Sequence, residues 1–294
     1  MITLPDTLPS ELALPLRALL AAPDYRGRIS AADAAMLAKA SELAGDALLQ
    51  ALVPVAAAFA RPAISNYRVG AVARGASGAL YLGMNMEFPG HVLGASGHGE
   101  RSAVANAFAH GETRLTDLAV SAAPCGYCRQ FLWELESAPA LRILLPQRHP
   151  FTLHDLLPQA FGPADLDIET RLLRPQAHDL WFEATDDCAK AALAAANASY
   201  APYTGCPAGL GIELLDGRVF AGRLAENAAY SPTQSPIEAT LALVALAGAS
   251  WEEMLRAVLV QKPGVVDHTA ETLDILDAIA PRCELIVVGA SIRG

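Results

Sequence analysis

Residues 97–136 indicate the fold and read GHGERSAVANAFAHGETRLTDLAVSAAPCGYCRQFLWELE. Apolar residues recur at helical spacing over residues 97–109, and Gly111 follows as an expected helix stop. Residues 115–121 have the composition of a strand, and residues 125–136 again follow helical spacing. This stretch therefore predicts a helix, a strand and a second helix in direct succession.

The sequence on both sides extends this unit. Upstream, residues 46–60 predict an apolar helix that stops before Pro62, and residues 69–73 and 79–83 predict a hairpin around a glycine-containing turn. Downstream, residues 141–145 predict a further strand. The order helix, hairpin, helix, strand, helix, strand is typical of an α/β fold. We therefore expect a three-layer α/β/α sandwich with a mixed sheet.

A second copy of this pattern follows in the C-terminal part of the chain. Residues 187–198 predict a helix, and residues 209–214 and 219–222 predict a hairpin. Glu226 lies 139 positions after Glu87, and the other matched positions share nearly the same offset. These matches indicate an internal duplication.

The duplication divides the chain into predicted segments. A small helical N-terminal segment covers residues 1–45, and a first α/β/α domain covers residues 46–165. A linker covers residues 166–185, and a second domain covers residues 186–294. The sequence thus predicts a duplicated sandwich with a short helical segment before it.

Charge and composition narrow the possible functions. The 294 residues carry a net charge of −10 and no cluster of Lys and Arg, so a nucleic-acid polymer would be repelled over most of the surface. The N-terminal residues do not have the basic start and apolar core of a signal peptide, and the longest apolar runs fall short of the ~20 residues of a membrane helix. We expect a cytoplasmic protein that binds a small molecule, with no nucleic-acid partner and no membrane partner.

Five cysteines are spread along the chain, and only Cys125 and Cys128 are close together. An odd number of scattered cysteines argues against a disulfide framework. The close pair is therefore a metal-binding, a redox or a chance pair.

Two motifs within the quoted stretch favour the metal. They are HGE at residues 98–100 and PCGYC at residues 124–128, which together give the pattern typical of zinc-dependent nucleobase and nucleoside deaminases. One imidazole and two thiolates fill three of zinc's four positions and leave the fourth for water. We predict one Zn²⁺ per chain, held by His98, Cys125 and Cys128. A redox pair or half a zinc knuckle would explain the cysteines alone, and a closed structural site would need another ligand.

Glu100 is expected to be the catalytic residue rather than a fourth ligand, because a fourth ligand would exclude water. A carboxylate beside zinc-bound water can take its proton, deliver it to ring nitrogen N3 of a cytosine base and help protonate the departing amine. The zinc-bound hydroxide would meanwhile attack C4 of the ring.

With these residues, the chain resembles the cytidine deaminase family, in its longer two-domain homodimeric form. Three further segments carry the resemblance, namely SNYRVGA at residues 65–71, NMEF at residues 85–88 and LLPQAFGP at residues 156–163. The resemblance implies hydrolytic deamination of cytidine and 2′-deoxycytidine to uridine and 2′-deoxyuridine, with release of ammonia, in pyrimidine salvage.

The resemblance also implies the substrate-binding residues. Asn85 and Glu87, on either side of Met86, would hold the sugar hydroxyls. Since this pair can take the 3′-hydroxyl whether or not a 2′-hydroxyl exists, both nucleosides would be accepted. Tyr67 would pack against the base, and Phe161 would reach over the base from the neighbouring chain; as an alternative, both are ordinary core aromatics.

Two small residues complete the implied site. Backbone groups of Gly99 and Ala123 would contact the base, at positions where the family usually has Ala and Thr. The change to Gly99 is expected to loosen the start of the helix.

The second copy is expected to bind no zinc. Pro236 stands where His98 would be, the segment around Cys283 lacks a second C-x-x-C, and Leu224 replaces the equivalent of Asn85. Glu238 would keep the position of the catalytic glutamate without a metal. We interpret this half as a decayed copy retained for packing and for a homodimer whose active sites lie near the subunit interface.

Two other functions share part of this pattern. A deaminase of bases in RNA or single-stranded DNA would need a basic channel, and Glu87 would repel a 3′-phosphate. A non-enzymatic, zinc-stabilised interaction protein would gain nothing from a carboxylate such as Glu100 beside the metal.

Overall fold

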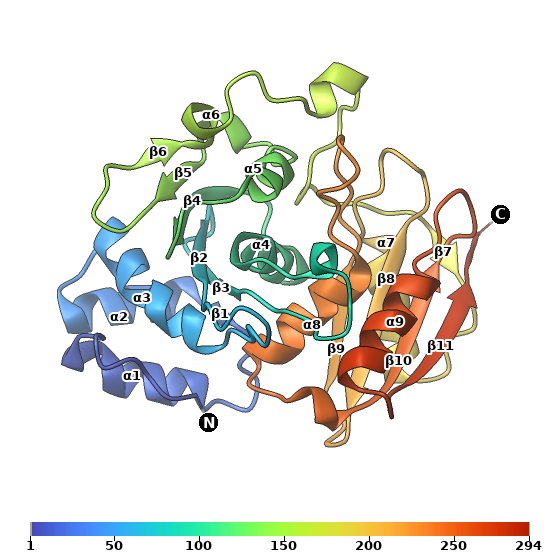
Figure 1. Ribbon diagram of the computed structural model, residues 1–294, viewed down its shortest axis with the longest axis horizontal. Helices are drawn as coiled ribbons and strands as arrows, with labels where there is room; N and C mark the ends of the chain where they lie inside the picture. The colour runs from blue at the N-terminus through green and yellow to red at the C-terminus, as the bar shows by residue number, and fades with distance from the viewer. Residues whose placement is uncertain (1, 294) are drawn as a thin grey trace.

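In the computed structural model, which describes residues 2–293, the first half of the chain forms a six-stranded mixed sheet (Figure 1). In spatial order its strands are β1 (Arg28–Ile29), β3 (Leu80–Met84), β2 (Gly70–Gly75), β4 (Leu115–Val120), β5 (Arg142–Leu144) and β6 (Phe151–Thr152). Only β4 and β5 run parallel among these pairs of described strands. Helix α3 (Asp46–Ala58) packs on one face of the sheet, and α4 (Gly99–Ala109) packs on the other with α5 (Gly126–Leu132) beside it. This arrangement confirms the three-layer sandwich.

The second half repeats this arrangement. Its sheet has the spatial order β11 (Glu284–Gly289), β10 (Met254–Gln261), β8 (Ala208–Leu214) and β9 (Val219–Arg223), with β10 and β11 parallel. Helix α7 (Asp187–Asn197) covers one face, while α8 (Pro236–Leu246) covers the other and contacts α9 (Thr269–Ile279). Helices α4 and α8 pack against each other between the two sheets (Figure 1). The duplication is confirmed, with these two helices at the centre of the molecule.

Helix α4 and helix α8 lie very close to their sheets at equivalent glycines. A Cβ on Gly83 would come within 2.2 Å of the carbonyl oxygen of Gly99, and a Cβ on Gly222 within 2.3 Å of the nitrogen of Thr240. No side chain larger than hydrogen fits at either place without moving the helix. The same close packing in both halves fixes which residues of the two helices are equivalent.

This equivalence corrects the predicted match between the halves. Both helices have eleven residues, and the residues that precede them are His98 and Ser235. Ser235, and not Pro236, therefore takes the position of His98, and Glu238 matches Arg101 rather than the catalytic glutamate. The reason is a connection two residues shorter in the second half, between the bridges Met86↔Gly97 and Ala225↔Gln234.

The predicted match around Cys283 was also wrong. Strand β10 corresponds to β4, so the counterpart of the cysteine loop is residues 262–268, ahead of α9. The residue before α9 is His268, in the position that Cys125 occupies before α5. Cys283 lies beyond α9, outside this loop.

The N-terminal segment contains the expected helices, α1 (Ser10–Leu20) and α2 (Ala31–Ser41). It also contains β1, which pairs with β3 and extends the first sheet, so it is part of the sandwich rather than only a helical appendage. The carbonyl of Gly27 accepts a hydrogen bond of 2.8 Å from Asn106 of α4. The segment thus packs on the region where the two halves meet.

The remaining elements connect the halves. Helix α6 (Leu153–Leu156) follows β6, and β7 (Leu180–Trp181), inside the predicted linker, pairs with β12 (Ser291–Ile292) near the C-terminus. The buried carboxylate of Glu134 accepts hydrogen bonds from the hydroxyls of Tyr200 and Tyr203, at 2.8 and 2.7 Å. The boundaries at residues 45, 165 and 185 stay predictions.

The predicted helix over residues 125–136 ends earlier, at Leu132. Beyond it, the amides of Trp133 and Glu134 bond to carbonyls three residues back, which tightens the chain into a turn. Glu134 thereby reaches the second half.

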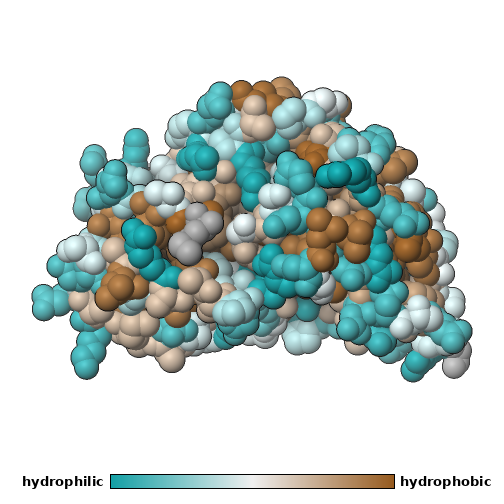
Figure 2. All heavy atoms as spheres, turned by 90° about the horizontal axis from the view of Figure 1, so that it is seen from below, coloured by the Kyte–Doolittle hydropathy of each residue, from teal (hydrophilic) through white to brown (hydrophobic). Residues whose placement is uncertain are grey.

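No helix within residues 2–293 is long and apolar enough to span a membrane. On the face seen from below, apolar side chains lie in several patches among hydrophilic ones (Figure 2). Such a mixture is usual for a protein surface in contact with water.

Candidate active site

Two helix starts bring the predicted metal ligands together. His98 directly precedes α4, Cys125 directly precedes α5, and Cys128 lies in the first turn of α5. Nδ1 of His98 lies 3.5 Å from Sγ of Cys125 and 3.4 Å from Sγ of Cys128, and the three ligand atoms lie within 4.8 Å of one another. Within the described part of the chain, no other three His, Cys, Asp or Glu side chains form such a group. One imidazole and two thiols fit zinc, with a fourth position left open.

Cys125 is electrostatically prepared to bind a cation, whereas the hydrogen bond with Cys125 and burial raise the pKa of Cys128 before a cation binds. The hydrogen bond with Cys128, together with that to His98, lowers the pKa of Cys125 to about 3. A thiolate is therefore present at neutral pH, as a zinc ligand must be.

Glu100 lies in the first turn of α4 and is 4% exposed. Burial raises the pKa of its carboxyl above the usual range, opposed by hydrogen bonds to the backbone and to Cys128. A buried carboxyl beside a metal centre, with a raised pKa, is suited to accepting and returning a proton near neutral pH.

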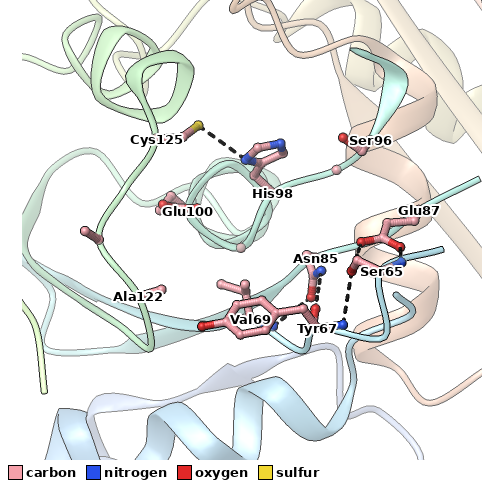
Figure 3. Close-up of a pocket in the computed structure, with 13 residues that line it drawn as sticks. Ser65, Tyr67, Val69, Asn85, Glu87, Ser96, His98, Glu100, Ala122 and Cys125 are labelled. Atoms are coloured by element: carbon pink, nitrogen blue, oxygen red, sulfur yellow. Dashed lines mark hydrogen bonds between the residues drawn. The ribbon is translucent and has the colours of Figure 1, made fainter. Parts of the chain in front are cut away.

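A cavity of about 330 Å³ opens against this group (Figure 3). His98, Cys125 and Glu100 lie along one side of it, and Asn85 and Glu87 lie across from them. The complete lining is Ser65, Tyr67, Val69, Asn85, Glu87, Ser96, Gly97, His98, Gly99, Glu100, Ala122, Ala123 and Cys125. Eight of these were predicted as site residues, and the structure brings all eight to one cavity.

Asn85 holds the loop that carries Tyr67. Its Oδ1 accepts a bond of 2.8 Å from the amide of Val69, and its Nδ2 donates a bond of 2.9 Å to the carbonyl of Tyr67. An amide nitrogen has two hydrogens, so one donor of Asn85 is left for another partner.

Glu87 holds the preceding part of the same loop. Its Oε2 accepts bonds of 2.8 and 2.7 Å from the amides of Ile64 and Ser65, and Oε1 accepts the Ser65 hydroxyl. Burial acts to raise the pKa of Glu87, but the bonds from Ser65 and Ile64 outweigh it and lower the pKa. The side chain is therefore ionised, and Oε1 keeps a lone pair for a further hydroxyl.

The small size of Gly99, which lines the cavity, has a steric reason. A Cβ on Gly99 would lie 3.1 Å from Cγ1 of Val69, tighter than ordinary van der Waals contact. Gly99 and Val69 thus pack together beside Ala123, and Tyr67, 59% exposed, completes this side.

Two predicted substrate residues lie elsewhere. Met86 is fully buried and does not line the cavity, although its amide and carbonyl pair with Gly97, which does. Phe161 is 45% exposed, and its carbonyl accepts a bond of 2.7 Å from Gln130. It does not line the cavity of its own chain.

Five lining residues were not predicted as site residues, namely Ser65, Val69, Ser96, Gly97 and Ala122. Ser65 and Val69 fall within the SNYRVGA segment, Gly97 and Ala122 lie directly beside predicted residues, and Ser96 lies two positions before His98. A serine at position 65 does not by itself indicate a site, because its role depends on a hydrogen bond to Glu87, which lies far from it in the sequence.

This fold and this metal centre define a class of protein, the zinc-dependent deaminases with an α/β/α core. Residues 45–141 match a family model described as the cytidine and deoxycytidylate deaminase zinc-binding region, and residues 153–273 match a second model with the same description. Both halves of the chain are therefore related to this region.

Whole-length relatives specify the family further. The chain is 44% identical to the cytidine deaminase of Enterobacter sp. (strain 638) over 92% of each chain, and 39% identical to that of Photobacterium profundum over 97% of each. The chain belongs to the cytidine deaminase family, and it is a zinc-dependent hydrolase.

Solved structures of shorter relatives match part of the chain. The cytidine deaminase from Mycobacterium tuberculosis is 36% identical and covers 39% of this chain and 95% of its own, with a TM-score of 0.36. The one from Burkholderia pseudomallei is 31% identical and covers 38% and 96%, with a TM-score of 0.35.

Proposed function

We propose that this protein deaminates free cytidine and 2′-deoxycytidine by hydrolysis, giving uridine or 2′-deoxyuridine and ammonia for pyrimidine salvage. The observation that carries the proposal is the single cavity with a metal-binding group and Glu100 on one side and Asn85 and Glu87 on the other. Its volume, about 330 Å³, is within the range of small-molecule sites.

The zinc ligands in this proposal are His98, Cys125 and Cys128. Zinc, when bound, supplies a Lewis acid that lowers the pKa of a water molecule and so makes it a nucleophile at neutral pH. The position of the ligands at helix starts keeps them rigid, because each is followed by a turn of hydrogen-bonded backbone.

Glu100 moves the protons of the reaction. Its carboxylate takes a proton from the attacking water and gives it to N3 of the pyrimidine, so that C4 accepts the new C–O bond. Glu100 then takes the second proton of that water from the new C4 hydroxyl and delivers it to the amino group. The C4–N4 bond breaks, ammonia leaves and the C4 oxygen becomes the carbonyl of the product. Burial favours this cycle because the raised pKa of Glu100 brings its two protonation states closer in free energy near neutral pH.

Asn85 and Glu87 bind the sugar. The free N–H of Asn85 donates to a sugar hydroxyl, and Oε1 of Glu87 accepts from it, so that the 3′-hydroxyl is recognised as both acceptor and donor. The ionised Glu87 repels a phosphate at that position. Met86 holds the pair in place through its backbone bonds to Gly97.

The base lies between Tyr67 and the backbone of Gly99 and Ala123. The proposed assembly is a cytoplasmic homodimer in which Phe161 closes over the base in the neighbouring chain. Its exposure and its place outside the cavity of its own chain support this role.

The test measures the loss of ultraviolet absorbance of cytidine, 2′-deoxycytidine and cytidine 3′-monophosphate with the purified, zinc-loaded protein. Both nucleosides should be converted and the 3′-phosphate spared. Glu100→Gln should lower kcat by roughly 100-fold to 10,000-fold while retaining zinc. The matched control Glu136→Gln changes an exposed carboxylate paired with Arg174 and should leave the rate unchanged. A zinc-loaded protein that converts neither nucleoside refutes the proposal.

A further inference from the structure

The second half of the chain contains a cavity of its own, of about 460 Å³. It is lined by Tyr203, Thr204, Leu224, Glu226, Tyr230, Thr233, Val265, Val266 and His268. The function proposed above does not use this cavity.

The second cavity occupies the place that corresponds to the active site. Five of its lining residues match lining residues of the first cavity by the equivalence of the halves. The matched pairs are Thr204 with Ser65, Leu224 with Asn85, Glu226 with Glu87, Thr233 with Ser96 and His268 with Cys125. The duplication has thus retained an open cavity as well as a packed domain.

The end of the second cavity that corresponds to the sugar site of the first keeps the same hydrogen bonds. Glu226 accepts bonds of 2.8 and 3.2 Å from the amides of Tyr203 and Thr204, and it also accepts the Thr204 hydroxyl. Glu87 makes the same three kinds of bond in the first half. Even the left-handed residue of the loop is repeated, with φ of 57° at Asn66 and 63° at Gly205.

The end that corresponds to the metal centre is different. Ser235 replaces the histidine ligand, His268 replaces the first cysteine, and Glu271 replaces the second. The described residues form no metal-binding group here. The second cavity therefore cannot carry out a chemical step that needs zinc, which leaves ligand binding as its function.

His268 has an unused hydrogen-bonding atom at this end. It is 7% exposed, and its Nε2 has no partner among the described residues. Burial lowers the pKa of His268, outweighing the nearby Asp267, so the ring is neutral at neutral pH. A buried polar atom without a partner costs about 1–3 kcal/mol, and a ligand that bonds to it removes this penalty.

We propose that the second cavity binds a nucleoside without converting it. Glu226 accepts a sugar hydroxyl as Glu87 does, and the base lies against Leu224, Val265 and Val266 with its polar edge bonded to Nε2 of His268. The carboxylate disfavours phosphorylated and other anionic ligands. This binding is independent of the deamination proposed above.

The test counts bound uridine, which hydrolytic deamination leaves unchanged. Equilibrium dialysis of the full-length, zinc-loaded protein, with uridine taken into the millimolar range, should give two uridines per chain. Val265→Trp fills the second cavity from a side chain that is 85% exposed, and His268→Leu removes the unpaired nitrogen. Each variant should bind one uridine per chain and deaminate cytidine at the wild-type rate.

The matched control is Leu215→Trp, which adds the same indole at an exposed hairpin position outside the cavity and should keep both uridines. One uridine per chain in the wild type with full cytidine turnover, or two in both cavity variants, overturns the proposal. If instead cytidine is not converted, but one bound uridine is lost with Val265→Trp, the second cavity stands and the deaminase proposal fails.

Discussion

Substituting Glu238→Leu should lower the free energy of unfolding more than any single surface change. Nη2 of Arg101 lies 2.8 Å from Oε1 of Glu238, and these side chains are 7% and 4% exposed. Without the carboxylate, the buried guanidinium would keep only carbonyl partners, those of Ser96 at 2.8 Å and Thr233 at 3.3 Å. Leaving a buried charge without its counter-ion costs about 3–5 kcal/mol.

Burial raises the pKa of Glu238 to about 7, against the opposing charge of Arg101. The assay is therefore urea unfolding at about pH 8.5, where the carboxylate is ionised, followed by far-ultraviolet circular dichroism at one fixed protein concentration. Glu238→Gln, which keeps the shape and one acceptor, should cost less than Glu238→Leu. The double variant Arg101→Met with Glu238→Leu removes both charges and should recover to within about 1 kcal/mol of the wild type or exceed it. The reasoning is refuted if Glu238→Leu lies within about 1 kcal/mol of the wild type, or if the double variant is less stable than the single one.

Cys128→Ser should abolish binding of the one zinc per chain, measured by atomic emission after dialysis, whereas Cys283→Ser should retain it; zinc retained by both variants would contradict the ligand assignment. Glu87→Gln should raise KM for cytidine by roughly 10-fold or more, since a hydrogen bond to a charged group is worth about 1.5–3 kcal/mol, and an unchanged KM would exclude a role in sugar binding. At Glu112, burial acts to raise the pKa, but hydrogen bonds led by that from Ser77 outweigh it and lower the pKa below the usual range. Stability contributed by Glu112 is thus present above the ordinary glutamate pKa and lost as the pH falls through the lowered value. Urea midpoints between about pH 5 and pH 3 should therefore fall less in Glu112→Gln than in the wild type, and parallel curves would show that the carboxylate contributes nothing.

The sequence predicts that His98, Cys125 and Cys128 lie together because these residues and Glu100 belong to two short helix starts. Each motif fixes its local geometry, and the single strand between them brings the starts together. The sandwich itself is predictable for a similar reason, since its helices and strands are long enough to show their periodicity.

Features that depend on distant contacts were not predictable. Strand β1 has two residues and forms only because β3 offers an edge, so no alternation marks it. The misplaced match at Pro236 came from a connection shortened by two residues, which a constant offset cannot reveal. The hydrogen bonds from Asn85 to the loop of Tyr67 likewise join segments that are separate in the sequence.

The pairing of Arg101 with Glu238 also bears on why two such domains benefit from sharing one chain. The two residues are third in their helices, so they occupy the same position of the repeated unit and meet where α4 packs against α8. If two identical domains associated through this contact, symmetry would place the same residue on both sides, and arginine would face arginine. Joining the copies in one polypeptide frees each side to mutate separately, so that opposite charges can meet at the centre.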